Sequence, residues 1–498
     1  MKRTVWASAL LSVVLAASAV PLATAASAAS CGTVHGTVTD EHTGVALPGM
    51  LVEVVGIAEW AGQGVVASAT SAADGSFAIP VTCANMSATT RTTDPSGFYG
   101  PRYGGAGTDV ESGSGFWLGG NGEDVAQDRS VRLTAPGRLV PVEPTRVIDT
   151  REDAEGPLGP GEVARFLLDE LPDHTVAVVL NLTATQGTAS TSFVSALSYQ
   201  YAEPRTSVIN SSAGRDVANL VTVPVSRYSE SGVYEVVLYN NAGYTHLVAD
   251  LQGIYSSDEG AGFQPIAPTR VLDTRDSSPL GPRGTRSLVL AGPGKVAPAD
   301  AVAAAVTITS TRATARTSYV SAYPSDATDG PSTSVLNAYQ NDDIPNLAIV
   351  PLGPDGALTL YNDQGSTDIV VDVVGWFVES GGADYYPIEA RRAVGSRTVD
   401  TGRVLEFTAD SAQVEVRDDA VAMSLNLTTA SASKLSYLTV YPTGTTRPFA
   451  SNANARPGAD IATGVLTRLG AGAAFSVYNN SGDVLALVDV SGYFAVND

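Results

Sequence analysis

Hydrophobic positions along this chain come in short runs that are separated by turn-forming residues. Leu180 to Thr185 (LNLTAT), Val236 to Gly243 (VVLYNNAG) and Leu247 to Tyr255 (LVADLQGIY) are three such runs, rich in apolar and β-branched residues. Asn and Gly end the second run, as they often do in β-hairpins. About seven or eight short strands of this kind in each copy described below predict a β-sandwich or a small barrel.

These runs recur in the same order three times. The first copy opens on PTRVIDTR (Pro144 to Arg151) and the second on PTRVLDTR (Pro268 to Arg275), whereas the third has ARRAVGSR (Ala390 to Arg397) at this place. All three copies later contain a YN-x-x-G turn and a final apolar strand with one Asp and one Gly. The period, about 120 residues, is that of a whole domain. We therefore expect three linked domains, each with its own core, rather than a solenoid of small units.

The N-terminus carries the pattern of an export signal. Lys2 and Arg3 precede an apolar run from Val5 to about Val20, and small residues suited to cleavage follow, such as Ala26-Ser27-Ala28. This pattern predicts a secretory signal peptide. No later run is long and apolar enough to span a bilayer. The expected location is secreted and extracellular, with non-covalent association with the cell wall as a second outcome.

The domain borders follow from the signal and the repeats. We predict an all-β chain of tandem β-sandwich-like domains, with a signal peptide over residues 1–30, a small N-terminal sandwich over 31–135, and homologous repeats over 137–256, 263–378 and 384–498. The linkers between the repeats, SSDEGAG from Ser256 and ESGGAD from Glu379, are short and rich in Gly or Ser.

The segment after the signal peptide differs from the repeats. It contains GTVTDEHTGVALPGMLVEVVG (Gly36 to Gly56) and SAADGSFAIP (Ser71 to Pro80), with a G-x-V-x-D opening, an LPG turn and an ADGSF turn. It resembles the carboxypeptidase regulatory-like domain, and the resemblance implies a small prealbumin-like β-sandwich. It implies no peptidase activity, because this module accompanies many unrelated secreted proteins.

Both cysteines of the chain, Cys31 and Cys83, lie in this first segment. In an oxidising compartment two cysteines predict a disulfide bond, Cys31–Cys83. The alternative is a lipoprotein anchor at Cys31, although the preceding Ala28-Ala29-Ser30 lacks the usual Leu three residues before the cysteine. A disulfide would leave no cysteine for zinc.

The three copies are similar to a repeat of exported cell-envelope proteins in high-GC Gram-positive bacteria, the actinobacteria. There the pattern PTRxxDTR…LYNxxG…DVxGxF follows or replaces catalytic domains. The resemblance covers residues 137–498. It implies the cell envelope as the setting, and it implies neither a ligand nor a mechanism.

The acidity of the chain and its lack of catalytic motifs exclude several functions. The formal net charge of −22 argues against nucleic acid and anionic lipid as partners, since both attract basic surfaces. The four histidines form no HExxH, and no GxSxG is present, so zinc and serine hydrolases are not expected. We expect no enzyme and no cofactor. A structural Ca²⁺ held by turns such as Asn362-Asp363 stays open as an alternative, although no DxDxDG loop is present.

The repeated PTRVLDTR motif contains the main candidates for polar contacts. If RVLDTR is a strand, Asp273 and Arg275 share one face and can pair, while Arg270 needs another partner. Asp372, in the last apolar strand of the same copy, needs a partner if it is buried. We predict a structural ion pair, either Arg270–Asp372 or Arg275–Asp372. The equivalent sets are Arg146, Arg151 and Asp250 in the first copy and Arg392, Arg397 and Asp489 in the third.

Exposed aromatic residues on loops are the candidates for ligand contacts. The predicted sugar-binding patch lies in the first segment and comprises Phe98, Tyr99, Tyr103, Phe116 and Trp117. The sequence thus predicts a non-catalytic secreted scaffold for binding or adhesion at the cell envelope, with wall polysaccharide or another surface protein as partner. The alternatives are a spacer without a ligand and a carbohydrate-active enzyme. The enzyme would need a deep cleft with two carboxylates about 5–10 Å apart, one with a raised pKa.

Overall fold

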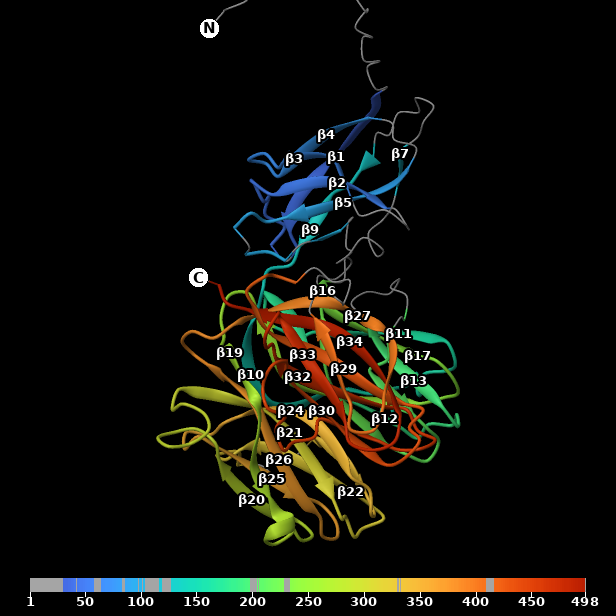
Figure 1. Cartoon of the computed structure of the whole chain (residues 1–498), viewed down its shortest axis with the longest axis vertical. Coiled ribbons are helices and arrows are strands. Elements are labelled where there is room, and N and C mark those ends of the chain that lie inside the picture. The colour runs from blue at the N-terminus through green and yellow to red at the C-terminus, as the bar shows by residue number, and fades with distance from the viewer. Residues whose placement is uncertain are drawn as a thin grey trace, which may run out of the picture.

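The computed structural model describes residues 30–497, except for 42, 58–63, 83–85, 97, 101, 104–115, 119–126, 198–203, 205, 228–232, 329–330, 332 and 409–415. Across this range every named element is a strand, apart from one 3-10 turn, η1 (Thr274–Asp276), so the chain is all-β as predicted. The strands form pairs of sheets, one pair in the N-terminal segment and one in each repeat. Figure 1 shows the N-terminal pair above a body that contains the three repeats. In the part described, no helix is long and apolar enough to cross a membrane.

The N-terminal segment folds into a small sandwich. One sheet contains β4 (Ser76–Thr82), β1 (Ser30–Asp40) and β8 (Gln127–Asp128) in that order, with β9 (Val131–Leu133) beside β1. The other contains β3 (Val65–Thr70), β2 (Leu51–Ile57), β5 (Met86–Thr93) and β6 (Arg102–Tyr103), with β7 (Phe116–Leu118) beside β5. Side chains alternate along β4, where Phe77, Ile79 and Val81 are buried in the core and their neighbours are more exposed. This alternation is expected of a sheet with one solvated face.

Each repeat is a sandwich whose inner sheet contains the first and last strands of the repeat. The inner sheets are β10 (Arg138–Asp149), β18 (His246–Ser256), β12 (Thr175–Thr185), β15 (Val217–Pro224); β19 (Gly262–Asp273), β26 (Asp368–Val378), β21 (Ala301–Thr311), β24 (Ile344–Pro351); and β27 (Asp384–Val399), β34 (Val484–Ala495), β29 (Ala420–Ala430), β32 (Ile461–Arg468). The identical order in all three repeats reflects their common sequence pattern.

The outer sheets also keep one order. They are β11 (Glu162–Leu168), β17 (Tyr234–Asn240), β13 (Ser192–Leu197), β14 (Ile209–Ser211), with β16 (Ser226–Arg227) beside β17; β20 (Gly284–Val289), β25 (Ala357–Asn362), β22 (Thr317–Pro324), β23 (Leu336–Tyr339); and β28 (Val404–Thr408), β33 (Ala474–Asn479), β30 (Ser436–Pro442), β31 (Ala453–Ala455). Each pair of sheets encloses its own core.

The middle strands of the inner sheets, such as β12 and β26, are buried on both faces, which explains their unbroken apolar runs. Every residue of β12 is buried. Val178 and Leu180 belong to the core of the first repeat, whereas Ala177 and Val179 belong to a second core that all three repeats share. A strand that faces apolar surroundings on both sides has no polar face, so its sequence shows no alternation.

We call this shared cluster the central core. The end of each last strand contributes one ring, and the start of each first strand contributes one large apolar side chain. These residues are Tyr255, Phe377 and Phe494, and Leu139, Phe263 and Tyr385. Rings meet across repeat boundaries, for example Phe263 and Phe494 with centroids 4.5 Å apart. The shared core is a feature that the sequence did not predict. Each repeat has its own core, but the inner faces of the repeats are buried against one another.

Backbone hydrogen bonds close the three repeats into a ring. The first strands of consecutive repeats exchange bonds of 2.7–2.9 Å in the pairs Leu139 and Ala261, Phe263 and Ala383, and Tyr385 and Gly137. The third pair returns from the last repeat to the first, so the ring is complete. The two short linkers supply Ala261 and Ala383, and their small residues allow this close approach.

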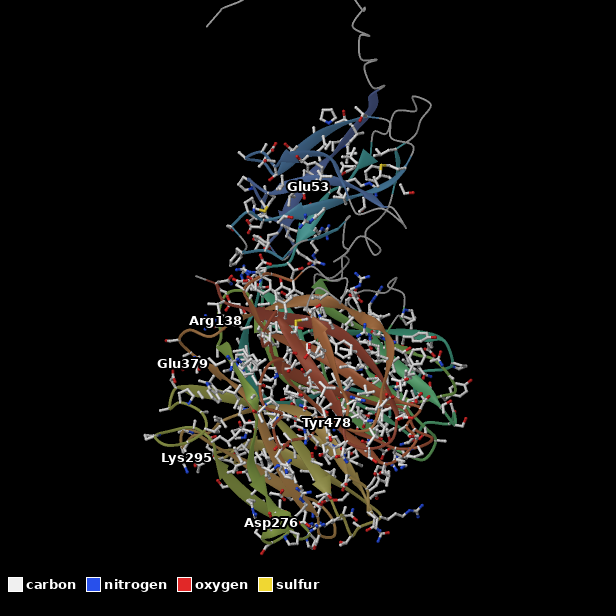
Figure 2. The ribbon with its side chains drawn as sticks, in the orientation of Figure 1. Glu53, Arg138, Asp276, Lys295, Glu379 and Tyr478 are labelled. Atoms are coloured by element: carbon white, nitrogen blue, oxygen red, sulfur yellow. The ribbon has the colours of Figure 1, made fainter. Side chains whose placement is uncertain are left out.

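Arg138 fastens the ring at the end that faces the N-terminal sandwich (Figure 2). Its Nε donates to the carbonyl oxygen of Gly260 at 3.0 Å, and its Nη2 donates to the carbonyl oxygen of Gly381 at 2.7 Å. One side chain of the first repeat thus binds both linkers.

Candidate functional site

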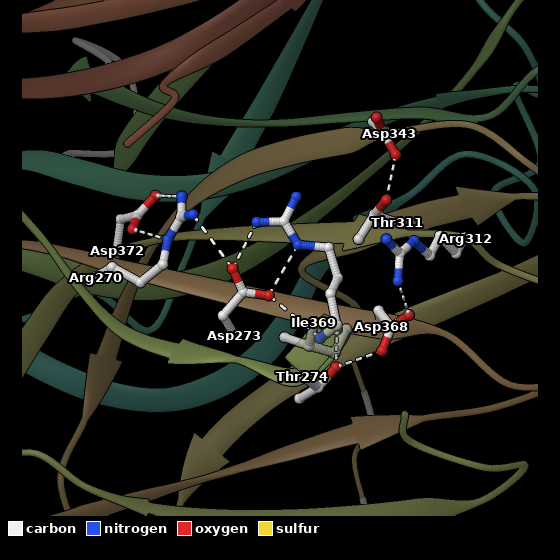
Figure 3. Close-up of polar contacts among 10 residues, drawn as sticks. Arg270, Asp273, Thr274, Thr311, Arg312, Asp343, Asp368, Ile369 and Asp372 are labelled. Carbon is white, nitrogen blue, oxygen red and sulfur yellow. Dashed lines mark hydrogen bonds and ion pairs between the residues drawn. The ribbon is translucent and has the colours of Figure 1, made fainter. Parts of the chain in front are cut away.

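The PTRVLDTR motif lies at the end of β19 and joins this strand to β26 (Figure 3). Arg270 donates from Nε to Oδ1 of Asp372 at 2.9 Å and from Nη2 to Oδ2 at 3.0 Å. Asp372 is almost fully buried. Of the two predicted links, the structure has Arg270–Asp372. Arg146 and Asp250 form the same pair in the first repeat, with Nε and Oδ1 2.9 Å apart.

A β-bulge beside Arg270 changes the partners that strand alternation predicts. Two residues of β19 oppose one residue of β26 here, so Val271 is extra. Asp273 accepts from Nε of Arg275 at 2.8 Å, as expected, and it also lies 3.3 Å from Nη1 of Arg270. The bulge breaks the alternation and brings both arginines to one carboxylate, which a regular strand would not do.

The third repeat keeps part of this arrangement. Arg392 donates from Nε to Oδ1 of Asp489, while Gly395 stands where the other copies have the motif aspartate. Arg397 does not join this pair in the part described. Its guanidinium lies 5.9 Å from the centre of the Phe407 ring. The prediction that Arg397 takes part in the ion pair is therefore wrong. Arg275 of the second repeat binds Asp273, and Gly395 replaces that aspartate in the third repeat.

Burial and ion pairing act in opposite directions on the motif carboxylates. Burial raises the pKa of the three last-strand aspartates, and the hydrogen bonds from their arginines offset this rise only in part. These aspartates are Asp250, Asp372 and Asp489. Hydrogen bonds from Arg151 lower the pKa of Asp149 to about 2. Because each of these carboxylates is bound by an arginine, the motif is a structural link between strands.

The YN-x-x-G turn is structural as well. Nδ2 of Asn362 donates to the carbonyl oxygens of Leu280, Gly281 and Gly365 at 3.2, 3.0 and 2.9 Å. Asn240 and Asn479 make corresponding contacts in the other two repeats. One buried amide thus ties the hairpin to the segment that precedes the first outer strand.

The predicted aromatic patch of the first segment is not assembled as expected. Phe116 is 6% exposed and belongs to the core of the N-terminal sandwich. Tyr99 packs against the same core, and Phe98 is exposed. The side chains of Tyr103 and Trp117 lie outside the described part of the chain. The prediction is wrong for Phe116, because a small sandwich gains more from burying this ring than from exposing it.

The predicted disulfide lies outside the described part as well. Cys83 and the side chain of Cys31 are not described, so the Cys31–Cys83 bond stays a prediction. Ser30 and Thr82, which precede the two cysteines, are paired opposite each other in β1 and β4.

A cavity of about 280 Å³ lies where all three repeats meet, and we call it the axial cavity. Because the repeats form a ring, residues at one sequence position come together around its axis. The short outer strands contribute Asn210, Asn337 and Asn454, and the turns that follow contribute Asp216, Asp343 and Asp460. Phe193 adds an aromatic ring to the wall.

Polar contacts between repeats hold the rim of the axial cavity. Asp342 of the second repeat binds Arg215 of the first at 2.7 Å and Arg456 of the third at 2.5 Å. Nδ2 of Asn454 donates to the backbone oxygen of Asp343 at 2.8 Å. The rim is therefore preorganised by groups from all three repeats.

Other groups in the cavity wall keep free hydrogen-bonding capacity. Thr185 and Thr311 donate to Asp216 and Asp343, but the third repeat has Ala430 at the corresponding place. The exposed carboxylate of Asp460 consequently has no partner among the described residues. Nδ2 of Asn337 is also unpaired within this range. In the same range, no group of three or more His, Cys, Asp or Glu side chains could hold a metal ion.

Sequence reasoning missed the axial cavity because its residues form no catalytic or metal-binding motif. The asparagines of SVIN, SVLN and SNAN recur in all three copies, and the three aspartates follow at similar spacings. The recurrence of these polar residues, which no turn or buried ion pair explains, was the signal in the sequence that could have indicated the cavity. Their convergence depends on the closed ring, which no single copy reveals.

Comparisons with known proteins find remote likenesses among solved structures. No family model and no curated protein matches the chain. Among solved structures, the triple jelly roll of an archaeal virus matches at 9% identity and a TM-score of 0.17, over 73% of this chain and 91% of that chain. A structure from Sulfolobus Turreted Icosahedral Virus matches at 11% identity and a TM-score of 0.16, over 72% and 92%. The tandem CBM22 domains of Xyn10C from Paenibacillus barcinonensis match at 9% and 0.15, over 47% and 97%. At these TM-scores the likenesses carry no inference about function.

Proposed function

We propose that this chain is a non-catalytic secreted scaffold that binds polysaccharide at the cell envelope through the axial cavity. The observation that carries this proposal is the convergence of amide and carboxylate side chains from three repeats around one cavity of about 280 Å³. This volume is near the lower end of the range for small-molecule pockets, roughly 300–1,000 Å³, and suits about one or two sugar rings.

The chemistry of the wall supports a sugar as the ligand. Planar amides and carboxylates, as in Asn210 and Asp460, can each make two hydrogen bonds with neighbouring hydroxyl groups. Phe193 offers an apolar face for the C–H side of a sugar ring. The rim arginines are already bound by Asp342, so they do not require an anionic ligand.

The balance of charge favours a ligand without negative charge. Four aspartates and two arginines line the cavity, which gives a formal charge of −2; they are Asp216, Asp342, Asp343, Asp460, Arg215 and Arg456. An anionic polysaccharide would meet net repulsion there. Neutral or amine-bearing sugars fit this surface better.

The positions of the aspartates with a raised pKa favour binding over glycoside hydrolysis. A hydrolase needs a carboxylic acid with a raised pKa in its cleft. The aspartates whose pKa burial raises, Asp250, Asp372 and Asp489, lie on the last inner strands, where arginines bind them. The secreted location and the envelope setting rest on the N-terminal signal and on the resemblance of the repeats.

Co-sedimentation with insoluble peptidoglycan and with wall polysaccharide tests this proposal. We expect the chain without its signal peptide to sediment with at least one of them, and Asp460→Arg, which fills the cavity with a long cation, to stay in the supernatant. Glu379→Arg is the matched control, because it makes the same charge change at an exposed linker position (Figure 2). If the unchanged chain stays in the supernatant with both materials, the spacer alternative replaces this proposal.

A further inference from the structure

A second pocket, of about 140 Å³, opens between the second and third repeats beside the axial cavity. Asp343 and Asn454 line both, so the two spaces adjoin through shared walls. Tyr437 lines the second pocket, and it occupies the sequence position that Phe193 holds in the first repeat. Equivalent aromatic rings thus accompany both spaces.

Phe449 projects at the edge of this second pocket and is 78% exposed. The guanidinium of Arg270 lies over the ring, 5.1 Å from its centroid. This contact covers part of the ring, and most of the side chain stays exposed to solvent. A large aromatic side chain gains free energy from burial, so an exposed and oriented ring beside a polar pocket is suited to stack on a ligand.

Phe449 breaks the symmetry of the ring of repeats. The corresponding positions are Arg205 in the first copy and Ser332 in the second, both polar. The extra aromatic surface therefore belongs to one boundary, that between the second and third repeats. A ligand that uses it must leave the axial cavity in one direction.

The arginines of the second pocket do not make it an anion site. Arg270 is bound by Asp372 and Asp273, and Arg275 is bound by Asp273. Asp343 adds a further carboxylate to the lining. The charge of this pocket therefore gives an anion no advantage, as in the axial cavity.

We infer that the ligand is a linear glycan without negative charge, which runs from the axial cavity past Asp343 and Asn454 and stacks one sugar ring on Phe449. This inference rests on the proposed function and specifies its ligand class. Two adjoining polar spaces, each with an aromatic ring, match the repeating polar edges and apolar faces of a sugar chain. A single sugar would occupy the axial cavity alone and would gain nothing from Phe449.

A glycan array tests this inference. The array carries chains of one to six sugars, built from neutral hexose, N-acetylhexosamine, hexosamine or uronic acid. Titration calorimetry then measures the affinity for the chain that binds best and for its monomer. We expect binding that strengthens with chain length and is absent for uronic acid chains. Phe449→Ala should weaken binding of the long chain about tenfold and leave the monomer unchanged, whereas Phe449→Trp should retain the length dependence.

Leu435→Ala is the matched control, because Leu435 is 73% exposed in the same repeat but lines neither space. Both alanine variants change exposed side chains, so their melting temperatures should equal that of the unchanged chain. If the chain binds, Asp460→Arg abolishes binding and Phe449→Ala has no effect, this inference is overturned and the proposed function stands. Preference for uronic acid chains would also overturn it. If the chain binds no printed glycan, this inference is overturned. If the chain also stays in the supernatant in the sedimentation test, the proposed function fails as well.

Discussion

Tyr255, on the last strand of the first repeat, stacks on Tyr385, on the first strand of the third repeat, with ring centroids 4.3 Å apart and planes 26° apart. Both rings are almost fully buried in the central core. The contact joins the first repeat to the last, so it forms only when the ring is closed. The stability of each repeat is therefore coupled to that of the other two.

Replacement of Tyr385 by Ala should lower the stability of all three repeats together. Removing this ring leaves a cavity in the central core and costs about 3–5 kcal/mol, as large-to-small changes of aromatic residues do. Calorimetry should show one shared transition for the three repeats, moved to lower temperature. Tyr244→Ala, at a residue that is 56% exposed, should leave it in place. Three separate transitions, of which one moves, would contradict the coupling.

The fold class was predictable from the sequence because strand runs and turns are local signals. The Arg270–Asp372 link could also be predicted from the sequence, because comparison of the three copies shows which arginine and aspartate positions recur together. The closed ring was not predicted, although unbroken apolar runs such as that around Leu180 hinted at sheets buried on both faces. A repeat of domain length is compatible with separate domains, and the difference lies in contacts between copies.

Other parts of the candidate site could not be predicted, because they depend on geometry that the sequence pattern does not show. The β-bulge at Val271 brings Asp273 to Arg270, while simple alternation separates them. The axial cavity joins Asn210, Asn337 and Asn454, which lie far apart in the chain and meet only because the ring closes. The burial of Phe116 could not be predicted, because the Gly-rich sequence around it is typical of a loop and does not show that the ring belongs to the N-terminal core.

Asp372→Asn should cost more stability than Asp489→Asn. Both oxygens of Asp372 accept from Arg270, and the backbone N–H of Ser451 also donates to this carboxylate. An amide NH₂ would face a donor there, so we expect a loss of about 3–5 kcal/mol. Oδ2 of Asp489 has no partner among the described residues, so the amide is better tolerated there, at about 1–2 kcal/mol. Urea unfolding of both variants measures the difference, and equal losses would refute the bidentate argument.

Asp149→Asn should destabilise the protein at neutral pH and have less effect in acid. Hydrogen bonds from Arg151 lower the folded-state pKa of Asp149 from 3.8 to about 2. A lowered folded-state pKa contributes stability above pH 3.8, and this contribution is lost as the pH falls toward 2. With allowance for screening at the partly exposed arginine, the contribution is about 1–2 kcal/mol.

Denaturant titrations of both proteins between neutral pH and pH 3 check this expectation. Burial raises the pKa of Asp250, so that group acts in the opposite sense, but it is present in both proteins and largely cancels in the difference. A difference in unfolding free energy that stays constant over this range would show that Asp149 acts by packing rather than by charge.

Gly375→Ala should destabilise the second repeat through a steric clash. A Cβ atom there would lie 2.5 Å from the Phe263 ring and 2.8 Å from the backbone oxygen of Gln264. The ring belongs to the central core and the oxygen to the paired strand, so neither can move freely, and overpacking should cost about 3 kcal/mol. Gly281→Ala is the control, since a Cβ there would meet nothing within 4 Å. Thermal unfolding should show a clear loss for the first variant and almost none for the second. Equal melting temperatures of the two variants would mean that β19 can shift away from β26. The close approach of Phe263 would then not explain why the last strand of each repeat has a glycine at this position.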